Sequence, residues 1–182
     1  MKILVHVCCT ICFIYPYERL KEEGYEVVGY WYNPNIHPYM EYKARKEALE
    51  KYAEIEKIKI IYDEYDYINF LKSQLKNINR PARCINCYKY RLEKTARYAK
   101  ENGFPFFTTT LLSSHQQYHD EIKKLGEILA KEYEIEFYYE DFRKGWQRNK
   151  AIAKVYGLYS QKYCGCLISE WERFGGKNET KN

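Results

Sequence analysis

The first apolar run of this 182-residue chain is not followed by a glycine-rich loop. Residues 3–7 are mostly apolar, and the sequence continues CCTIC, with its first glycine only at position 24. In many α/β proteins the tip of the first strand holds a glycine-rich loop that binds phosphate at a helix N-terminus. The absence of that loop argues against nucleotide-phosphate chemistry at this position. Three thiols, Cys8, Cys9 and Cys12, stand in its place.

Long apolar runs and targeting signals are also missing. No stretch approaches the roughly 20 apolar residues that cross a bilayer. At the N-terminus one lysine and a few apolar residues precede the cysteines, without the small-residue cleavage site of a secretory signal. We therefore expect a cytoplasmic protein. No repeat or linker divides the chain, so we expect a single α/β domain over 1–175 with a cysteine-bearing C-terminal segment, and a frayed tail over 176–182.

The charge balance alone points to no particular partner. Thirty Lys and Arg residues against 25 Asp and Glu residues give a net charge of +5, which is only mildly basic. Aromatic residues make up 18% of the chain, with 21 tyrosines, and some of these could stack on nucleobases. A short basic run that borders Trp146 could contact phosphate. Its members are Arg143, Lys144, Arg148 and Lys150.

Short strand-like runs alternate with longer helical ones along the chain. The pattern predicts strands over 3–7, 26–32, 58–62, 105–110 and 135–139, and helices over 13–23, 41–55, 67–76, 88–102, 119–133 and 147–156. Strands separated by helices of this length pair in parallel through right-handed crossovers. We therefore expect a doubly wound α/β fold with a mainly parallel five-stranded sheet.

Polar residues follow four of the predicted strands. They are Cys8 and Cys9, the turn 33–35, Asp63 and Asp66, and the segment 108–114. The carboxyl ends of parallel strands meet at one edge of the sheet, where α/β proteins bind ligands. We expect the functional site at this edge. If Asp63 or Asp66 faces the cysteines there, its carboxyl group could serve as a proton donor or a hard metal ligand.

All seven cysteines fall into three clusters. In a reducing compartment, clustered thiols are more often metal ligands or redox catalysts than structural disulfides. The first two clusters precede predicted helices, whose N-terminal partial charge favours the thiolate that binds metal. Soft ligands in this number favour an iron–sulfur centre or a redox dithiol over structural zinc, which needs only four ligands. The clusters are Cys8, Cys9 and Cys12; Cys84 and Cys87; and Cys164 and Cys166.

Six motifs, in this order, closely resemble the cobalamin-independent epoxyqueuosine reductase family. They are HVCCTIC, YNPNIHPYMEYKARKEAL, RCINCYKYRLEKTARYAKENGF, FTTTLLSSH, DFRK and YGLYSQKYCGC. The resemblance covers Ile3 to about Ser169. It implies a sheet core like that of the adenine nucleotide alpha hydrolases, and the last step of queuosine synthesis, in which an epoxide on the modified tRNA base is reduced to an alkene. Two departures are Thr10-Ile11, where the family usually has Ala-Pro, and Ile168, where it usually has Tyr.

The resemblance also implies site residues and partners. Cys8, Cys9, Cys84 and Cys87 would ligate a 4Fe–4S cluster. Cys164 and Cys166 would form a redox-active pair or hold an additional iron, for which Cys12 is a further candidate ligand. The partners would be a tRNA carrying epoxyqueuosine at the anticodon and an electron donor. Two alternatives stay open: a zinc-stabilised RNA-binding module, and a sulfur-transfer or adenylating enzyme of similar fold, although the latter chemistry needs a phosphate-binding loop.

Overall fold

The computed structural model describes residues 1–175 and contains one five-stranded parallel sheet. Its strands are β1 (Lys2–His6), β2 (Glu26–Trp31), β3 (Lys59–Tyr62), β4 (Phe106–Thr109) and β5 (Glu136–Phe137). They lie in the order β3-β2-β1-β4-β5, and every neighbouring pair is parallel. The predicted doubly wound α/β fold is therefore confirmed, and the order of the strands reverses next to β1, the central strand.

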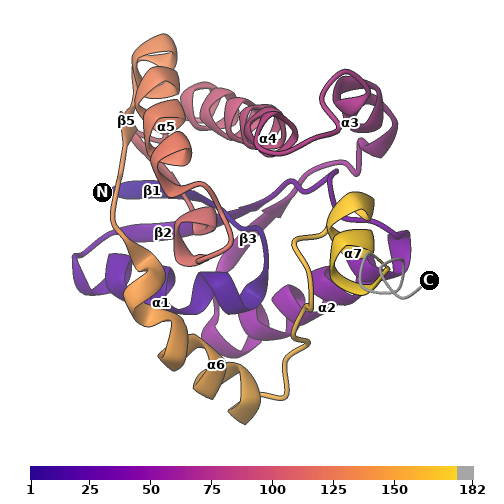
Figure 1. The fold of residues 1–182 in the computed structure, drawn as a ribbon. Helices are drawn as coiled ribbons and strands as arrows, with labels where there is room; N and C mark the ends of the chain where they lie inside the picture. Colours follow the sequence, from indigo (N-terminus) through magenta and orange to yellow (C-terminus); the bar gives the residue numbers. More distant parts are fainter. Residues whose placement is uncertain (176–182) are drawn as a thin grey trace.

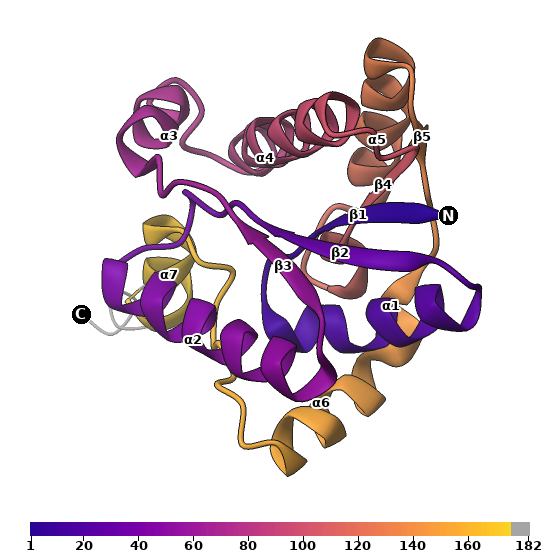
Figure 2. The same cartoon turned by 180° about the vertical axis from the view of Figure 1, so that it is seen from behind.

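Helices cover both faces of the sheet (Figure 1). Helices α1, α2 and α6 lie on one face, α4 and α5 lie on the other with α3 beside α4, and α7 lies next to α2 (Figure 2). Among the described residues no helix is both long and apolar enough to cross a membrane. The helices are α1 (Thr10–Glu22), α2 (Tyr39–Glu56), α3 (Tyr67–Gln74), α4 (Ala82–Glu101), α5 (His119–Tyr133), α6 (Trp146–Val155) and α7 (Leu167–Phe174), with the 3₁₀ turns η1 (Thr110–Ser113) and η2 (Phe142–Gly145).

The apolar run of β1 is buried on both faces, which is typical of a central parallel strand. Because successive side chains point to opposite faces, Ile3 and Val5 pack into the core beneath α1 and α2. Leu4 points the other way and packs with Leu92 and Phe107 under α4 and α5. Because β1 is buried on both faces, Cys8 and Cys9 have a defined position at its carboxyl end.

Three helix predictions need correction, and each concerns a cysteine. Helix α1 begins at Thr10 rather than at residue 13, because Cys9 acts as its N-cap. Helix α4 begins at Ala82 rather than at residue 88, because the carbonyl oxygen of its N-cap, Pro81, accepts a hydrogen bond of 3.0 Å from the N–H of Ile85. Cys84 and Cys87 therefore lie inside the first two turns of α4. Helix α7 follows Cys166 directly and has no counterpart among the predicted helices. The prediction of a frayed tail over 176–182 lies outside the described residues.

A candidate metal site built from cysteines

Cys8, Cys9 and Cys12 form a compact group at the N-terminus of α1. Their three sulfur atoms all lie within 4.8 Å of one another, which is close enough for one metal ion to bind them. The Cys9 Sγ accepts a hydrogen bond of 3.3 Å from the backbone N–H of Cys12 and so caps the helix. The strand–helix junction thus presents three soft ligands at a single point of the sheet edge.

Residues that follow β4 hold this group in place. The backbone N–H of Cys8 donates to Thr110 Oγ1 at 2.9 Å, and the Thr110 hydroxyl lies 3.2 Å from the Cys8 sulfur. Since β1 and β4 are adjacent, the polar tip of β4 lies beside the cysteines, as the topology predicts. Ser113 at the end of η1 also donates a hydrogen bond to the carbonyl oxygen of Cys12.

The three thiols of this group differ in acidity. Hydrogen bonds from Cys12, Cys9 and Thr110 to the Cys8 sulfur hold the pKa of Cys8 well below its ordinary value. Burial raises the pKa of Cys9, and the interaction with the Cys8 thiolate raises that of Cys12. Cys8 is therefore the thiol of this group that loses its proton most readily. Full deprotonation of all three needs a cation among them, which a metal ion provides.

The other four cysteines line a neighbouring cavity of about 310 Å³. Cys84 and Cys87 enter it from α4, and Cys164 and Cys166 enter it from the segment before α7. Its remaining wall is largely apolar, with Phe70, Leu71, Leu75, Ile78 and Leu167 among the lining residues. Burial raises the pKa of Cys84, and it raises that of Cys87 to about 12.

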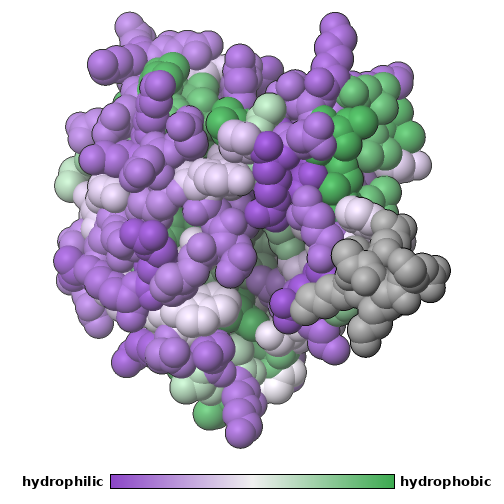
Figure 3. All heavy atoms as spheres, in the orientation of Figure 1, coloured by the Kyte–Doolittle hydropathy of each residue, from purple (hydrophilic) through white to green (hydrophobic). Residues whose placement is uncertain are grey.

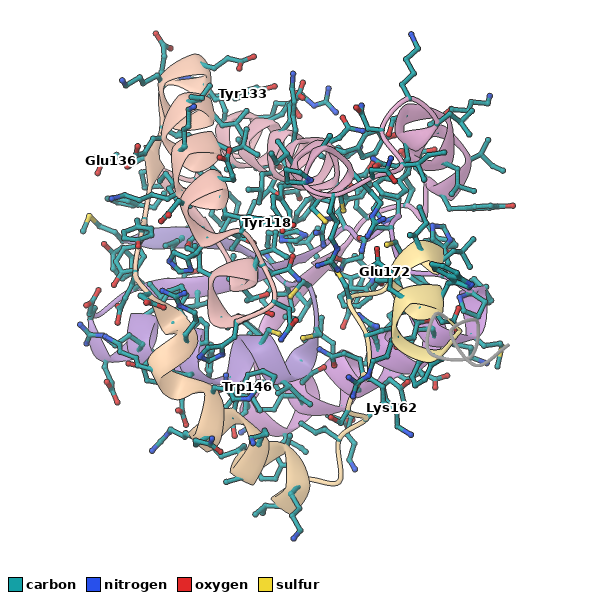
Figure 4. All side chains as sticks on the ribbon, in the orientation of Figure 1. Tyr118, Tyr133, Glu136, Trp146, Lys162 and Glu172 are labelled. Atoms are coloured by element: carbon teal, nitrogen blue, oxygen red, sulfur yellow. The ribbon has the colours of Figure 1, made fainter. Side chains whose placement is uncertain are left out.

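The two cysteine groups meet at Cys164. A second cavity of about 440 Å³ contains Cys8, Cys9 and Cys12, and both cavities share Cys164 and Gln117. The Gln117 amide donates to the Cys164 sulfur at 3.5 Å. Among the lining residues of the second cavity, Trp146, Lys162 and Glu172 are labelled in Figure 4, and the same face is hollowed in the space-filling view (Figure 3). The structure thus brings Cys8 and Cys9 to one cavity, and Cys84 and Cys87 to the adjoining one.

The Cys164-Gly165-Cys166 loop is fixed by residues that follow β2. Arg45 on α2 is 3% exposed, pairs with Glu41, and donates hydrogen bonds of 3.0 Å to the carbonyl oxygens of Tyr163 and Cys164. The backbone N–H of His37 donates to the Gly165 carbonyl oxygen at 2.7 Å. The motif YNPNIHPYMEYKAR therefore serves to hold the C-x-C thiols against the cavities.

The predicted carboxylates lie on the same edge but farther along it. Asp63 accepts a hydrogen bond from the Tyr30 hydroxyl and lies 3.5 Å from the ammonium group of Lys94. Asp66 accepts one from the Tyr90 hydroxyl at 3.0 Å. Neither carboxylate lines either cysteine cavity, because β3 stands two strands away from β1. Their role as proton donors stays a prediction.

Carboxylates pair with most of the basic run near Trp146. Arg143 pairs with Asp141, Lys144 pairs with Glu140, and Arg148 pairs with Glu18. Trp146 itself lines the second cavity and lies edge-on to the ring of His115.

The arginines that line the second cavity were not predicted from the sequence. They include Arg45, Arg80 and Arg91. For Arg91 a signal is present, because a residue four positions after Cys87 lies on the same face of a helix, one turn farther along.

Comparisons with known proteins agree on one family. The family model described as "Epoxyqueuosine reductase QueH" matches residues 3–172. Three relatives carry that same description. The protein from Dehalococcoides mccartyi is 39% identical, with 97% of each chain covered. That from Histophilus somni is 36% identical, covering 98% of this chain and 78% of the relative. That from Thermotoga maritima is 32% identical, covering 94% and 91%.

A solved structure confirms the type of fold. It is described as a predicted subunit of tRNA methyltransferase from Methanocaldococcus jannaschii, and it superposes with a TM-score of 0.60. The match covers 85% of this chain and 74% of that one. Because the two sequences are only 15% identical, the likeness is evidence for the fold alone.

Proposed function

The chain belongs to the epoxyqueuosine reductase QueH family and is an oxidoreductase of queuosine biosynthesis, and we propose that its seven cysteines carry the reduction of epoxyqueuosine in tRNA. One observation carries this proposal: all seven thiols converge on two adjoining cavities that share Cys164. A reduction needs electron carriers at the substrate, and clustered thiols supply ligands for such a carrier or act as one themselves.

We propose that Cys8, Cys9, Cys84 and Cys87 hold a 4Fe–4S cluster. The donor set fits such a group, because all four ligands are thiols, and one of them, Cys8, already favours the thiolate. When bound, the cluster passes electrons to the reaction one at a time. Cys12 lies within the same sulfur group as Cys8 and Cys9, so it is the further candidate ligand for an additional iron.

Removal of the epoxide oxygen to leave an alkene consumes two electrons and two protons and releases water. Oxidation of the Cys164 and Cys166 thiols to one disulfide releases two electrons and two protons, which matches this demand. Both cysteines are free thiols here, and Cys164 borders both cavities. We therefore assign the pair to electron storage beside the cluster, with binding of an additional iron as the alternative. An external electron donor then restores the thiols.

The second cavity has the chemistry to receive a modified nucleotide of tRNA. Lys162 and Arg173 supply positive charge for phosphate, whereas Arg80 is paired with Glu172, and Trp146 supplies a ring on which a base can stack. We propose Asp63 or Asp66 as the source of the proton for the departing oxygen; since neither lines a cysteine cavity, either would have to reach the substrate from outside both cavities. This assignment rests on their place at the same sheet edge, and their Asn variants test it through the pH profile of turnover.

Anaerobic reconstitution tests the proposal. Wild-type protein, Cys84→Ser and Cys87→Ser are supplied with iron and sulfide, metal content is counted, and turnover is measured on tRNA carrying epoxyqueuosine. We expect both Ser variants to lose the charge-transfer absorption and the activity. We expect Cys164→Ala and Cys166→Ala to keep a normal cluster and yet fail to form the alkene. A Cys84→Ser protein with a full complement of iron and sulfide would refute the ligand set.

A further inference from the structure

Three buried arginines lie around the cysteine cavities, and one of them differs from the others. Arg45 is paired with the carboxylate of Glu41 at 2.7 Å, and Arg83 with that of Glu172 at 2.8 Å. Arg91 is only 2% exposed, yet within residues 1–175 no carboxylate oxygen lies within 4 Å of its guanidinium group. The fold therefore buries one positive charge without a carboxylate partner.

The remaining contacts of Arg91 are weak and neutral. Its Nη1 donates to the side-chain oxygen of Asn33 at 3.4 Å, and its Nε donates to the carbonyl oxygen of Cys87 at the same distance. The buried Nη2 has no hydrogen-bond partner among the described residues. A buried guanidinium with an unused donor is costly unless an anion stands nearby.

The anions that Arg91 would meet are the thiolates of a metal-loaded centre. Arg91 lines the cavity that contains Cys8, Cys9, Cys12 and Cys164. Burial disfavours its charged form, but the nearby cysteine sulfurs, that of Cys87 foremost, leave the pKa of the guanidinium above its ordinary value.

The sequence of α4 places Arg91 close to two proposed ligands, Cys84 and Cys87. Cys84, Cys87 and Arg91 stand at positions i, i+3 and i+7, which share one face of a helix. Thr95, one turn farther on, bonds back to the Arg91 carbonyl, so this stretch of the helix is buried and regular. The helical register therefore places Arg91 one turn beyond Cys87, on the face that carries the proposed ligands.

We propose that Arg91 is the fixed counter-cation of the thiolate-ligated centre and raises the reduction potential of that centre. This inference rests on the proposed iron–sulfur function. Each electron that enters such a centre adds a negative charge, and a nearby buried cation stabilises the reduced form more than the oxidised form. Arg91 is thus a positioning and tuning residue, and it need not touch the substrate.

The test compares three variants of the full chain after anaerobic reconstitution. Arg91→Met removes the charge at similar length, Arg91→Lys keeps it, and Arg97→Met removes an exposed arginine from the same helix as a control. The readout is the midpoint potential of the centre in a redox titration followed by visible absorption. We expect Arg91→Met to lower the equilibrium constant of one-electron reduction at least about tenfold, which corresponds to about 59 mV. Arg91→Lys and Arg97→Met should stay close to wild type.

Equal potentials in Arg91→Met and Arg91→Lys would show that the charge has no effect and would overturn the inference. A second measurement covers the case in which wild-type protein takes up no iron and sulfide, which would refute the proposed cofactor. In metal-free protein, an uncompensated buried charge destabilises the fold, so Arg91→Met should melt at a higher temperature than Arg91→Lys. A lower melting temperature for Arg91→Met in that case would mean that Arg91 is an ordinary structural residue.

Discussion

The hydroxyl group of Ser113 donates a hydrogen bond of 2.8 Å to the carbonyl oxygen of Cys12. In a regular helix that oxygen would accept from the N–H four residues later, but the residue there is Pro16, which has no N–H. Both Ser113 and Cys12 are buried, so an unsatisfied carbonyl would have no access to water. The side chain from η1 thus replaces the missing helical bond and ties the cysteine loop to the tip of β4.

This relationship predicts a coupling between Ser113 and Pro16. In the wild-type background, Ser113→Ala leaves the Cys12 carbonyl unsatisfied and should lower the free energy of unfolding by about 1–3 kcal/mol. In the Pro16→Ala background the residue at position 16 supplies the helical N–H, so the same substitution should cost less. Urea unfolding of the four proteins measures the difference. Equal costs in both backgrounds would show that the two residues act independently.

A second prediction concerns pH and lies away from the cysteines. Burial, followed by the positive charge of Arg143, lowers the pKa of His119 below its ordinary value of 6.5. As pH falls through 6.5, His119 becomes protonated in the unfolded chain but stays neutral in the folded chain. The free energy of unfolding therefore falls as pH falls through that value. In His119→Gln this contribution disappears, and the loss of stability between pH 7.5 and pH 5.5 should be smaller. Parallel pH profiles for the two proteins would contradict the assignment.

The fold could be predicted because its decisive signals are local. The apolar run of β1 and the glycine that ends α1 lie within a few residues of the elements they define. The common edge of Cys8 and Thr110 also followed from topology, since parallel strands expose their carboxyl ends together. Helix α7 spans only eight residues, but Leu167, Trp171 and Phe174 stand at i, i+4 and i+7, so an amphipathic signal was present in the sequence and was missed.

The arrangement of the site depends on contacts that no local pattern reveals. Arg45 reaches the carbonyl of Cys164 across 119 positions of the chain, and this contact decides where the C-x-C loop lies. Within residues 1–175, the absence of a carboxylate beside Arg91 is likewise a property of the packed structure. Residue identities could therefore single out candidate thiols, whose roles stay a prediction, but they could not show which thiols share a cavity.

The last prediction tests the glycine between the two C-terminal cysteines. Gly165 has a φ of +132°, a conformation that L side chains rarely adopt, and an added Cβ would lie 3.1 Å from Ile36 and 3.3 Å from Arg45. Gly165→Ala should therefore push the loop away from Arg45 and misplace both thiols. Turnover should fall at least about tenfold, and iron and sulfide content should stay unchanged, because Cys8, Cys9, Cys84 and Cys87 are not displaced.

Gly103→Ala provides the matched control for this variant. Gly103 also has a positive φ, +70°, but nothing lies within 4 Å of its added Cβ, and it stands at the opposite end of α4 from Cys84. Its substitution carries a backbone cost of about 1–2 kcal/mol in stability without any effect on the cysteines. If Gly165→Ala lost stability like Gly103→Ala but kept the same turnover, the geometry of Cys164 and Cys166 would not govern the reaction. A selective loss of turnover in Gly165→Ala, with the centre intact, places the requirement on the spacing and orientation of the two thiols.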